Sequence, residues 1–311
     1  MNISSSAQPS RPASSHSRAY NFRKNPKAIA ALLLPALVLY TLFEVLPILQ
    51  SFFFSLFQWN GLARSPLRFV GLANFSELFK NEYFPLALGN TLWFMILSPV
   101  VQLSIGFVLA YLLSSGFRGH KLFKVVFFTP QVLTLTSVSI MWYFILFPAT
   151  GPLSSVLSAS GLGGLARNWL VDPQTAITTI ILVNSWIAIG FYMILFISAI
   201  ASISSEAFDA ADLDGSLGLH RVVHIVIPMI WDVVLVAFVI QITGNLKMFE
   251  FVYVMTKGGP DGLTNTLGTL LYNEAFEYQH FGTGSVISVV IFTLSLLITV
   301  LALRVMRRDA L

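Results

Sequence analysis

Six long apolar runs, separated by short polar segments, constrain the fold of this chain more than any other feature of its sequence. Each run reaches the roughly 20 residues that a helix needs to cross the hydrocarbon core of a bilayer. Only 10% of the residues are charged, whereas soluble domains average about 25%. The sequence therefore predicts an all-α polytopic membrane protein, with spans near residues 28–54, 91–114, 122–147, 176–200, 222–246 and 284–303.

The segment before the first run, residues 1–26, is rich in Ser, Pro and Ala and is predicted to be a disordered cytoplasmic tail. The first run follows Arg23, Lys24 and Lys27, as the apolar part of a signal peptide would. The run is longer than a signal peptide needs, and no small-residue cleavage site is obvious after it. We therefore expect a retained span, with residues 27–311 forming one six-span domain.

The distribution of Lys and Arg predicts the orientation of the spans, because cytoplasmic loops carry an excess of these residues. With the N-terminus inside, 12 of the 18 basic residues fall in the tails and in the loops on the inner side. We expect a multi-pass protein of a prokaryotic cell membrane with both termini in the cytoplasm. The same count puts the segment around residues 204–228 inside.

Two polar segments on the expected outer side contain signals for local structure. The stretch "GLANFSELF" predicts a short helix, for which Asn74 is a plausible N-cap. The stretch "TKGGPDG" predicts a turn, and the residues after it predict a short amphipathic helix at the membrane surface.

The segment Ser204–Pro228 differs from the rest of the chain, because it holds four carboxylates in nine residues: Glu206, Asp209, Asp212 and Asp214. Ser204 and Ser205 are suited to begin a helix, and Gly215 and Gly218 to end it. We expect a helix, a tight turn and a second amphipathic helix. A solvated linker between two spans is one interpretation of this hairpin. The other is a docking site, in which the small Ala residues allow close approach and the acids pair with a basic partner.

The same segment, "DAADLDGSLGLHRVVHIVIP", resembles the EAA loop of ABC importer permeases. That pattern is Glu-Ala-Ala, three residues, Gly, nine residues, Ile, one residue, Leu-Pro. Its positions are filled here by Asp209, Ala210, Ala211, Gly215, Ile225, Ile227 and Pro228. Asp209 departs from the Glu of the pattern, and Glu206 lies three residues too early to replace it. The stretches "FVGLANFSELF" and "FVYVMTKGGPDGLTNTLGTLLYNEAF" resemble the sugar branch of this family, and favour the first permease of its pair.

This resemblance implies a type I importer permease that forms half of a translocation pathway for a sugar or sugar-like solute. It implies a second homologous permease as partner, together with two ATPase subunits, or a homodimer of one, and an extracellular solute-binding protein. The ATPases would dock on a coupling loop, residues 204–225, whose candidate contact residues are Glu206, Asp209, Ala210, Ala211, Asp212, Gly215, Ile225 and Pro228. ATP and Mg²⁺ would be bound by the partner ATPases, and no cofactor by this chain.

Polar and aromatic side chains at membrane depth are candidates for the substrate path, because such groups are costly in a bilayer. Amide, carboxylate and aromatic groups also match the hydroxyls and apolar faces of sugars. The candidates are Asn184, Trp186, Gln241, Asn245, Phe249, Glu250 and Tyr253. Hydrogen bonding between helices is the alternative role of Asn184, Gln241 and Asn245, and Trp and Tyr near span ends also serve as interface anchors.

Several kinds of chemistry are disfavoured by the sequence. No Gly-x-x-x-x-Gly-Lys-Ser/Thr motif is present, so we expect no ATP hydrolysis and no catalytic residue in this chain. His220 and His224 are four residues apart but lack a third ligand motif, and we expect no metal. Nucleic acid is not expected as a partner, because the basic residues form no patch. A stand-alone secondary carrier or channel, in which the acidic loop is only a linker, is the alternative function.

Overall fold

The computed structural model describes residues 26–148, 150–216 and 218–306, so that most of the predicted N-terminal tail lies outside the described residues. The chain divides into two compact units, residues 1–50 and 51–311. The first apolar run is helical throughout, as α1 (Pro26–Tyr40), the π-helical turn η2 (Thr41–Val45) and α2 (Leu46–Phe54). Pro47 lies just after the π turn, at the second residue of α2.

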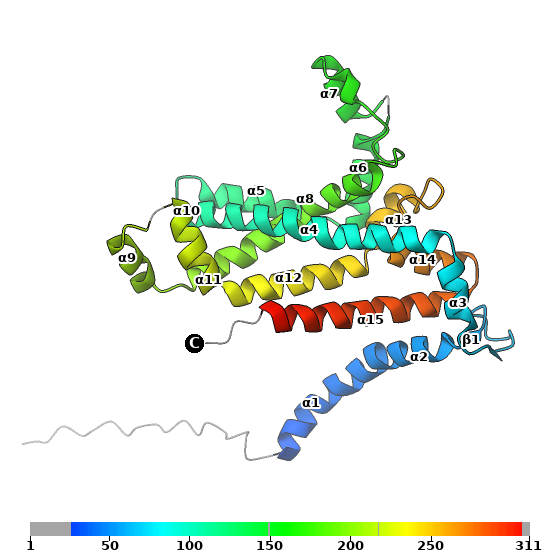
Figure 1. The fold of residues 1–311 in the computed structure, drawn as a ribbon. Coiled ribbons are helices and arrows are strands. Elements are labelled where there is room, and N and C mark those ends of the chain that lie inside the picture. Colours follow the sequence, from blue (N-terminus) through cyan, green and yellow to red (C-terminus); the bar gives the residue numbers. More distant parts are fainter. Residues whose placement is uncertain (1–25, 149, 217, 307–311) are drawn as a thin grey trace, which may run out of the picture. The chain divides into compact units, whose positions relative to one another are not determined.

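Long apolar helices form the centre of the second unit. They are α4 (Tyr83–Ser114), α8 (Ala176–Ala201), α12 (Trp231–Leu246) and α15 (Phe281–Met306). The pair α4 and α8 runs side by side over most of its length (Figure 1). Gly106 on α4 allows this packing, because a Cβ there would lie 3.0 Å from the Cβ of Tyr192 and 3.2 Å from the backbone nitrogen of Met193, both on α8. The outer faces stay apolar and exposed, as expected for helices in lipid.

Four helices of the described chain are long and apolar enough to cross a membrane, and the number reaches six if each of two bent pairs counts as one span. The first pair is α5 (His120–Val132) and α6 (Leu135–Ile145), bent by 98°. The second joins residues 218–229 to α12 at 76°. The all-α polytopic prediction is confirmed, and the predicted spans 122–147 and 222–246 each contain a bend between two helical pieces.

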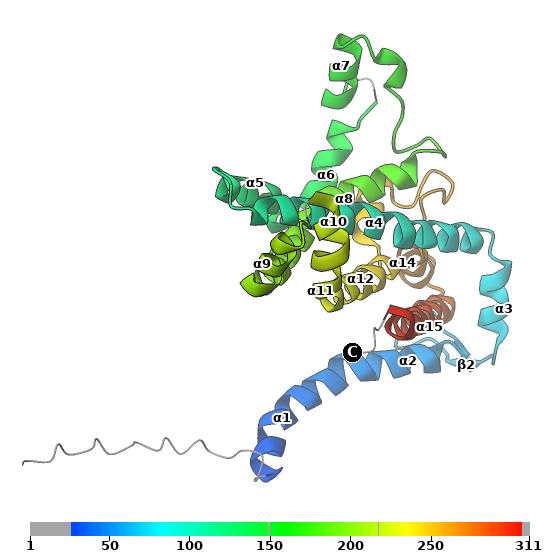
Figure 2. The ribbon, with the colours of Figure 1, turned by 60° about the vertical axis from the view of Figure 1, so that its left-hand side comes forward.

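Local sequence explains both bends. After Pro130, Leu133 and Thr134 adopt extended backbone, and the Thr134 side chain caps α6 by accepting from the N–H of Ser137. Figure 2 shows α6 turning away from α5 toward α7 (Pro152–Ala159) and the 3-10 turn η3 (Gly163–Leu165) that follows it. At the second bend, Pro228 and the non-helical Ile230 separate the two helical pieces. Apolar composition alone does not reveal such breaks.

The connecting segments gather at two opposite ends of the α4–α8 pair (Figure 1). One end carries the two-residue strands β1 (Phe57–Gln58) and β2 (Arg68–Phe69), which pair antiparallel, together with α3 (Ala73–Lys80). The same end carries α13 (Glu250–Thr256), α14 (Leu267–Tyr272) and η5 (Asn273–Glu277). The other end carries α9 (Ser205–Leu213), α10 (Gly218–Arg221), η4 (Val222–Val226) and α11 (Ile227–Met229).

Asn74 corrects one prediction at the first of these ends. The helix forms as predicted, but Asn74 lies inside α3 and is not its N-cap. Its side chain is buried and donates hydrogen bonds to the carbonyl oxygens of Ser55 and Phe57, at 2.8 and 2.9 Å. A long-range backbone contact therefore determines the role of this residue, and local capping does not.

Candidate functional site

The acidic segment forms the predicted hairpin of two helices. Ser204 occupies the N-cap position of α9, although its side chain makes no capping hydrogen bond. After α9, Gly215 has a φ of 67° and Gly218 a φ of 58°, both in the left-handed region that glycine tolerates. A Cβ at Gly215 would meet no atom within 4 Å, so glycine is favoured there by the backbone conformation and not by lack of space.

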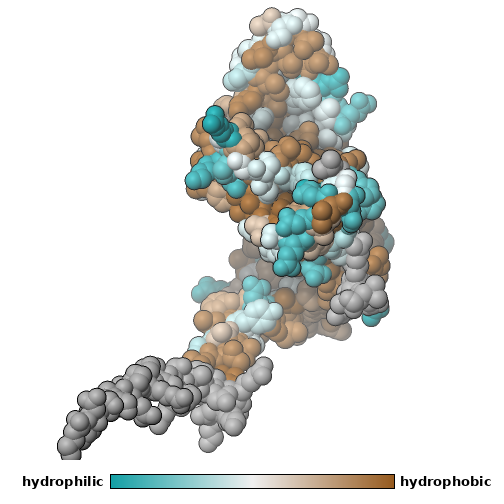
Figure 3. Space-filling model, turned by 90° about the vertical axis from the view of Figure 1, so that its left-hand side faces the viewer, coloured by the Kyte–Doolittle hydropathy of each residue, from teal (hydrophilic) through white to brown (hydrophobic). Residues whose placement is uncertain are grey.

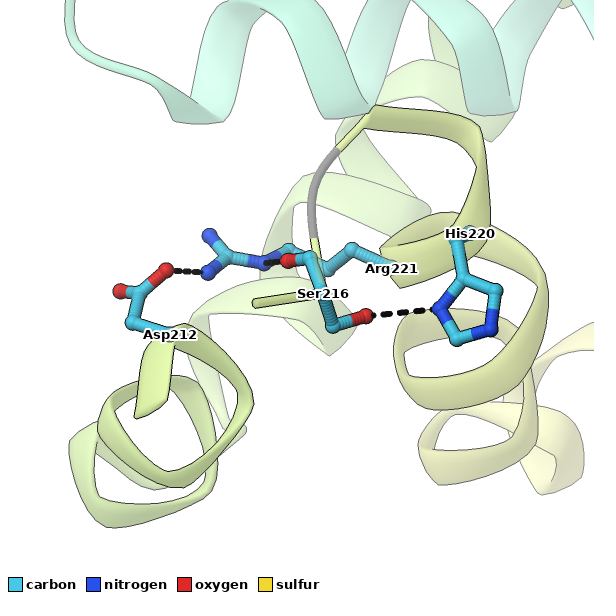
Figure 4. Close-up of polar contacts among 4 residues, drawn as sticks. All are labelled: Asp212, Ser216, His220 and Arg221. Atoms are coloured by element: carbon cyan, nitrogen blue, oxygen red, sulfur yellow. Dashed lines mark hydrogen bonds and ion pairs between the residues drawn. The ribbon is translucent and has the colours of Figure 1, made fainter. Parts of the chain in front are cut away.

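Arg221 lies on the second helical arm of the hairpin, at the end of α10, and connects it to the first arm, α9, and to the turn (Figure 4). It ion pairs with Asp212 on α9, and its Nε donates to the Ser216 carbonyl oxygen at 3.1 Å. The guanidinium also lies 5.8 Å from the ring centroid of Phe208, which suits a cation–π contact. Ser216 Oγ lies 3.0 Å from His220 Nδ1. These contacts connect both helices and the turn, so the hairpin is a defined structure and not a loose connection.

The outward surface of the hairpin is partly acidic and partly apolar. Glu206, Asp209 and Asp214 are exposed and make no ion pair within the described part of the chain. Asp212 differs, because its carboxylate is already paired with Arg221. Figure 3 faces this end of the molecule and shows hydrophilic side chains beside broad apolar areas.

Two leucines were missed by the sequence interpretation. Leu213 is 90% exposed and Leu219 is 77% exposed, on either side of the turn. Exposed apolar side chains that gather on one polar element are candidates for an interaction surface, and these two lie on the same acidic hairpin. The sequence feature that could have identified them is their position: both leucines flank a glycine turn in an acidic segment and belong to no apolar stripe.

The remaining predicted contact residues divide by burial. Ala210 is exposed beside Asp209, whereas Ala211 is 3% exposed and packs inward. Ile225 in η4 and Pro228 in α11 are half-buried, at the return to α12. The motif thus exposes Asp209 and Ala210, while Ala211 and the residues near its end take part in packing.

Two of the polar candidates inside the spans, Asn184 and Gln241, are hydrogen-bonded to Gln102, a residue that the sequence did not suggest as a candidate. Gln102 on α4 is fully buried and donates to Asn184 Oδ1 at 3.0 Å and to Ser185 Oγ at 3.1 Å, both on α8. Gln241 Nε2 on α12 donates to Gln102 Oε1 at 2.7 Å. Three helices are therefore linked through one amide. The sequence feature that could have identified Gln102 is its position as a single Gln in the middle of an apolar run.

Asn245 and Trp186 also make contacts between elements. Asn245, 3% exposed, donates to the Phe94 carbonyl oxygen at 3.2 Å. Trp186 is 39% exposed, and its ring meets that of Trp142 edge to face, with centroids 5.6 Å apart. Gln241 and Asn245 are thus buried between helices in this structure, while Trp186 and the half-buried Asn184 remain partly accessible.

The last three candidates lie in a half-exposed aromatic cluster at the end opposite the hairpin. Phe249, Tyr253 and Tyr272 form it, with centroids 4.8 to 5.0 Å apart. Tyr253 donates to Glu277 Oε1 at 3.4 Å, and Glu250 accepts from Thr136 on α6. Hydrogen bonding with Tyr272 is the largest cause that raises the pKa of Tyr253 to about 12. The cluster therefore offers aromatic faces, carboxylates and a protonated hydroxyl together.

His220 and His224 stack with centroids 4.2 Å apart, and His224 Nδ1 lies 3.1 Å from the His220 carbonyl oxygen. No group of three potential metal ligands surrounds them within the described residues. The pair is accounted for by ring stacking and contacts along the helix.

Residues 102–308 match the family described as binding-protein-dependent transport system inner membrane component. The chain belongs to this family. It is therefore the membrane permease of an importer that works with a solute-binding protein. This membership decides for the importer permease and against the stand-alone carrier or channel.

Individual relatives agree with the family. The permease is 35% identical to the probable ABC transporter permease protein YurN of Bacillus subtilis, over 88% of this chain and 93% of the relative. It is 31% identical to the lactose transport permease LacF of Rhizobium radiobacter, over 83% and 86%. It is 29% identical to the diacetylchitobiose uptake permease NgcF of Streptomyces coelicolor, over 87% and 80%.

Solved structures share the fold. A bacterial ABC transporter that imports the acidic polysaccharide alginate contains a chain with a TM-score of 0.79 to this permease and 22% identity. The match covers 94% of this permease and 100% of that chain. The same type of transporter in complex with its alginate-bound periplasmic protein gives a TM-score of 0.80.

Proposed function

We propose that this permease imports a sugar or sugar-like solute and couples to a partner ATPase through the hairpin 204–228. The observation that carries the coupling role is the pair of exposed leucines, Leu213 and Leu219, on a hairpin braced by Arg221. Such a hairpin suits a groove on the ATPase in which apolar residues contact the two leucines and basic residues pair with the exposed acids.

The proposed assembly contains a second homologous permease, two ATPase subunits or a homodimer of one, and the solute-binding protein. ATP and Mg²⁺ bind to the ATPases, and this chain holds neither. Closure of the ATPases pushes on the hairpin, and the attached helices move as rigid bodies between inward- and outward-facing arrangements. The hairpin adjoins α8 and α12 in sequence, so a push on it reaches two of the helices joined through Gln102.

We place the hairpin and both termini in the cytoplasm. The support is that most Lys and Arg residues lie in the tails and in the loops on the same side of the membrane as the hairpin. Reporter fusions after Ser115 and Ala201 are expected to report cytoplasm, and fusions after Gly61 and Asp261 the outside. A reversed pair would contradict this orientation.

A sugar as substrate is supported by the relatives named for lactose and diacetylchitobiose uptake. The cluster of Phe249, Tyr253 and Tyr272 supports it independently, because aromatic faces stack on sugar rings while nearby carboxylates accept from hydroxyls. We assign Asn184, Trp186 and Glu250 to the same path. Gln241 and Asn245 join it if the helices separate during transport.

The deciding experiment replaces Leu213 by Asp in the reconstituted complex. Burying a leucine contributes about 1.5–3 kcal/mol, so ATPase association should weaken on the order of tenfold to a hundredfold. The variant should fold normally, because the native side chain is almost fully exposed. Leu62→Asp, at an exposed leucine in the segment between β1 and β2, is the matched control and should leave ATPase association unchanged.

Uptake of labelled sugars and sugar-stimulated ATP hydrolysis are measured in the same preparations. Both should fall with Leu213→Asp while capture of sugar by the binding protein stays normal. Co-purification of the ATPase with Leu213→Asp at the wild-type yield would show that the hairpin is a passive linker.

A further inference from the structure

A cavity of about 580 Å³ lies beside the hairpin, where the ends of α4 and α8 meet the start of α5 and the two arms of the loop. Its walls are of two kinds. Buried or half-buried apolar side chains line one part, among them Leu113, Ile200 and Ile203. Ser115 and Ser205 line another. None of these residues has a role in the coupling or the transport path described above.

Three basic side chains also line the cavity: His120, Lys124 and Arg221. No Asp or Glu is among the described residues that line it. Lys124 is half-buried on α5 and lies within ion-pair distance of no carboxylate of the described chain. A cation that is partly removed from water without an opposite charge favours binding of an anion.

The position of the cavity restricts what that anion can be attached to. The helices α4 and α8 are two of the candidate membrane spans, and the cavity begins where both end. The ends of membrane-spanning helices lie near the depth at which lipid headgroups meet acyl chains. Basic pockets between helices at the cytoplasmic face suit anionic lipid headgroups, and the apolar part of the cavity wall suits the adjoining acyl chain.

We propose that this cavity binds the phosphate-bearing headgroup of an anionic phospholipid, with Lys124 as its principal cation and the wall of Leu113 and Ile200 against its glycerol and upper acyl chain. Arg221 lies at the same cavity and already pairs with Asp212. A guanidinium has five N–H donors, so it can contact a phosphate and the Asp212 carboxylate together. A bound lipid would therefore stabilise the hairpin in the orientation seen here.

The inference rests on the proposed function only for placing the cavity on the cytoplasmic side, where the leaflet is rich in anionic lipid. The cavity shares Ser205, Phe208 and Arg221 with the hairpin, but Leu213 and Leu219, the proposed ATPase contacts, and Lys124, the proposed lipid contact, belong to one site each. Loss of one is therefore distinguishable from loss of the other.

The test is native mass spectrometry of the purified transporter complex after its lipids have been exchanged for phosphatidylglycerol or phosphatidylcholine. The quantity measured is the amount of each lipid that the complex retains. Lys124→Ala is compared with Lys121→Ala, at an exposed lysine on the same helix. The wild type should retain phosphatidylglycerol in preference to phosphatidylcholine, and Lys124→Ala should lower that retention about fivefold. Lys121→Ala and Lys124→Arg should retain it as the wild type does.

Two controls identify the source of the phosphate and separate the proposals. Displacement of the lipid by millimolar glycerol 3-phosphate would overturn the lipid assignment, as would equal retention of both lipids or an unaffected Lys124→Ala. A cross-link between position 124 and another subunit of the complex would also overturn it, because it would show that protein and not lipid covers Lys124. If no ATPase co-purifies, the proposed coupling fails, but lipid retention by the permease still decides this inference.

Discussion

Arg221 and Asp212 join the two arms of the hairpin through an ion pair, although they are nine positions apart in sequence, across a glycine turn. Asp212 is 58% exposed at its side chain and Arg221 only 18%. The pair therefore has one partner in water and one held against Phe208 and the Ser216 carbonyl. This arrangement shapes the surface that we propose as the coupling site.

The first prediction concerns this pair. Arg221→Ala removes the ion pair and the bond to Ser216, so it should destabilise the hairpin more than Asp212→Asn. Solvent-exposed pairs contribute about 0.2–1 kcal/mol, and a double-mutant cycle should return a coupling energy in that range. Asp214→Asn, an exposed acid without an ion pair in the described chain, is the control. The measurement is ATPase co-purification together with thermal unfolding in detergent, and an additive cycle would contradict the prediction.

The second prediction concerns Gly215. Its φ of 67° strains most side chains but leaves open space around the Cβ position. Gly215→Asn should be tolerated, because Asn adopts this conformation readily, whereas Gly215→Val should cost about 1–2 kcal/mol or more and weaken ATPase association. Gly164→Val is the control, since Gly164 lacks both a positive φ and near neighbours. Equal behaviour of the Asn and Val variants would refute the backbone explanation.

The third prediction concerns Gln102. Gln102→Leu leaves the amides of Asn184 and Gln241 without their shared partner. Hydrogen bonds between membrane helices average about 0.6 kcal/mol, so the loss should be about 1–2 kcal/mol. The double variant with Gln241→Leu should lose less than the sum of the single variants. Thermal unfolding in detergent measures this, with the exposed Ser198→Ala as control.

The fourth prediction concerns the contact of α5 with α8 at Gly190. Gly190→Ala places a methyl against the backbone of Phe127 and Phe128, and overpacking of this kind costs about 1–3 kcal/mol. Gly244→Ala on α12 meets nothing within 4 Å and should be neutral or slightly stabilising. Unfolding temperatures of the two variants in one detergent give the comparison. A neutral Gly190→Ala would show that the two helices do not pack closely in the membrane.

The fifth prediction concerns Tyr253. Tyr253→Phe keeps the ring but removes the hydroxyl that contacts Glu277, so sugar uptake should show a higher KM at a nearly unchanged maximal rate. Because the pKa of Tyr253 is raised to about 12, the hydroxyl stays protonated at ordinary pH. The ratio of variant to wild-type uptake should therefore be constant from roughly pH 6 to 9. A ratio that changes across this range would assign the effect to another group.

The sequence by itself was sufficient for the fold class and for the hairpin. Length and hydropathy of the apolar runs are local properties, and they determine which segments prefer a bilayer to water. The hairpin follows from equally local signals, because Gly215 and Gly218 tolerate a positive φ at the places where the chain turns. The stretch from Asp209 to Pro228 resembles a known loop of the family to which the chain belongs.

The tertiary structure alone decided which polar residues meet and which apolar residues remain exposed. Gln102 is central because α4, α8 and α12 place three amides within hydrogen-bonding distance, and Asn74 is buried because the β1 segment folds over it. Leu213 and Leu219 stand out because nothing in the described chain covers them. Hydropathy and motifs describe neighbours along the chain. Contacts between segments far apart in sequence depend on packing angles and helix bends, which no single segment encodes.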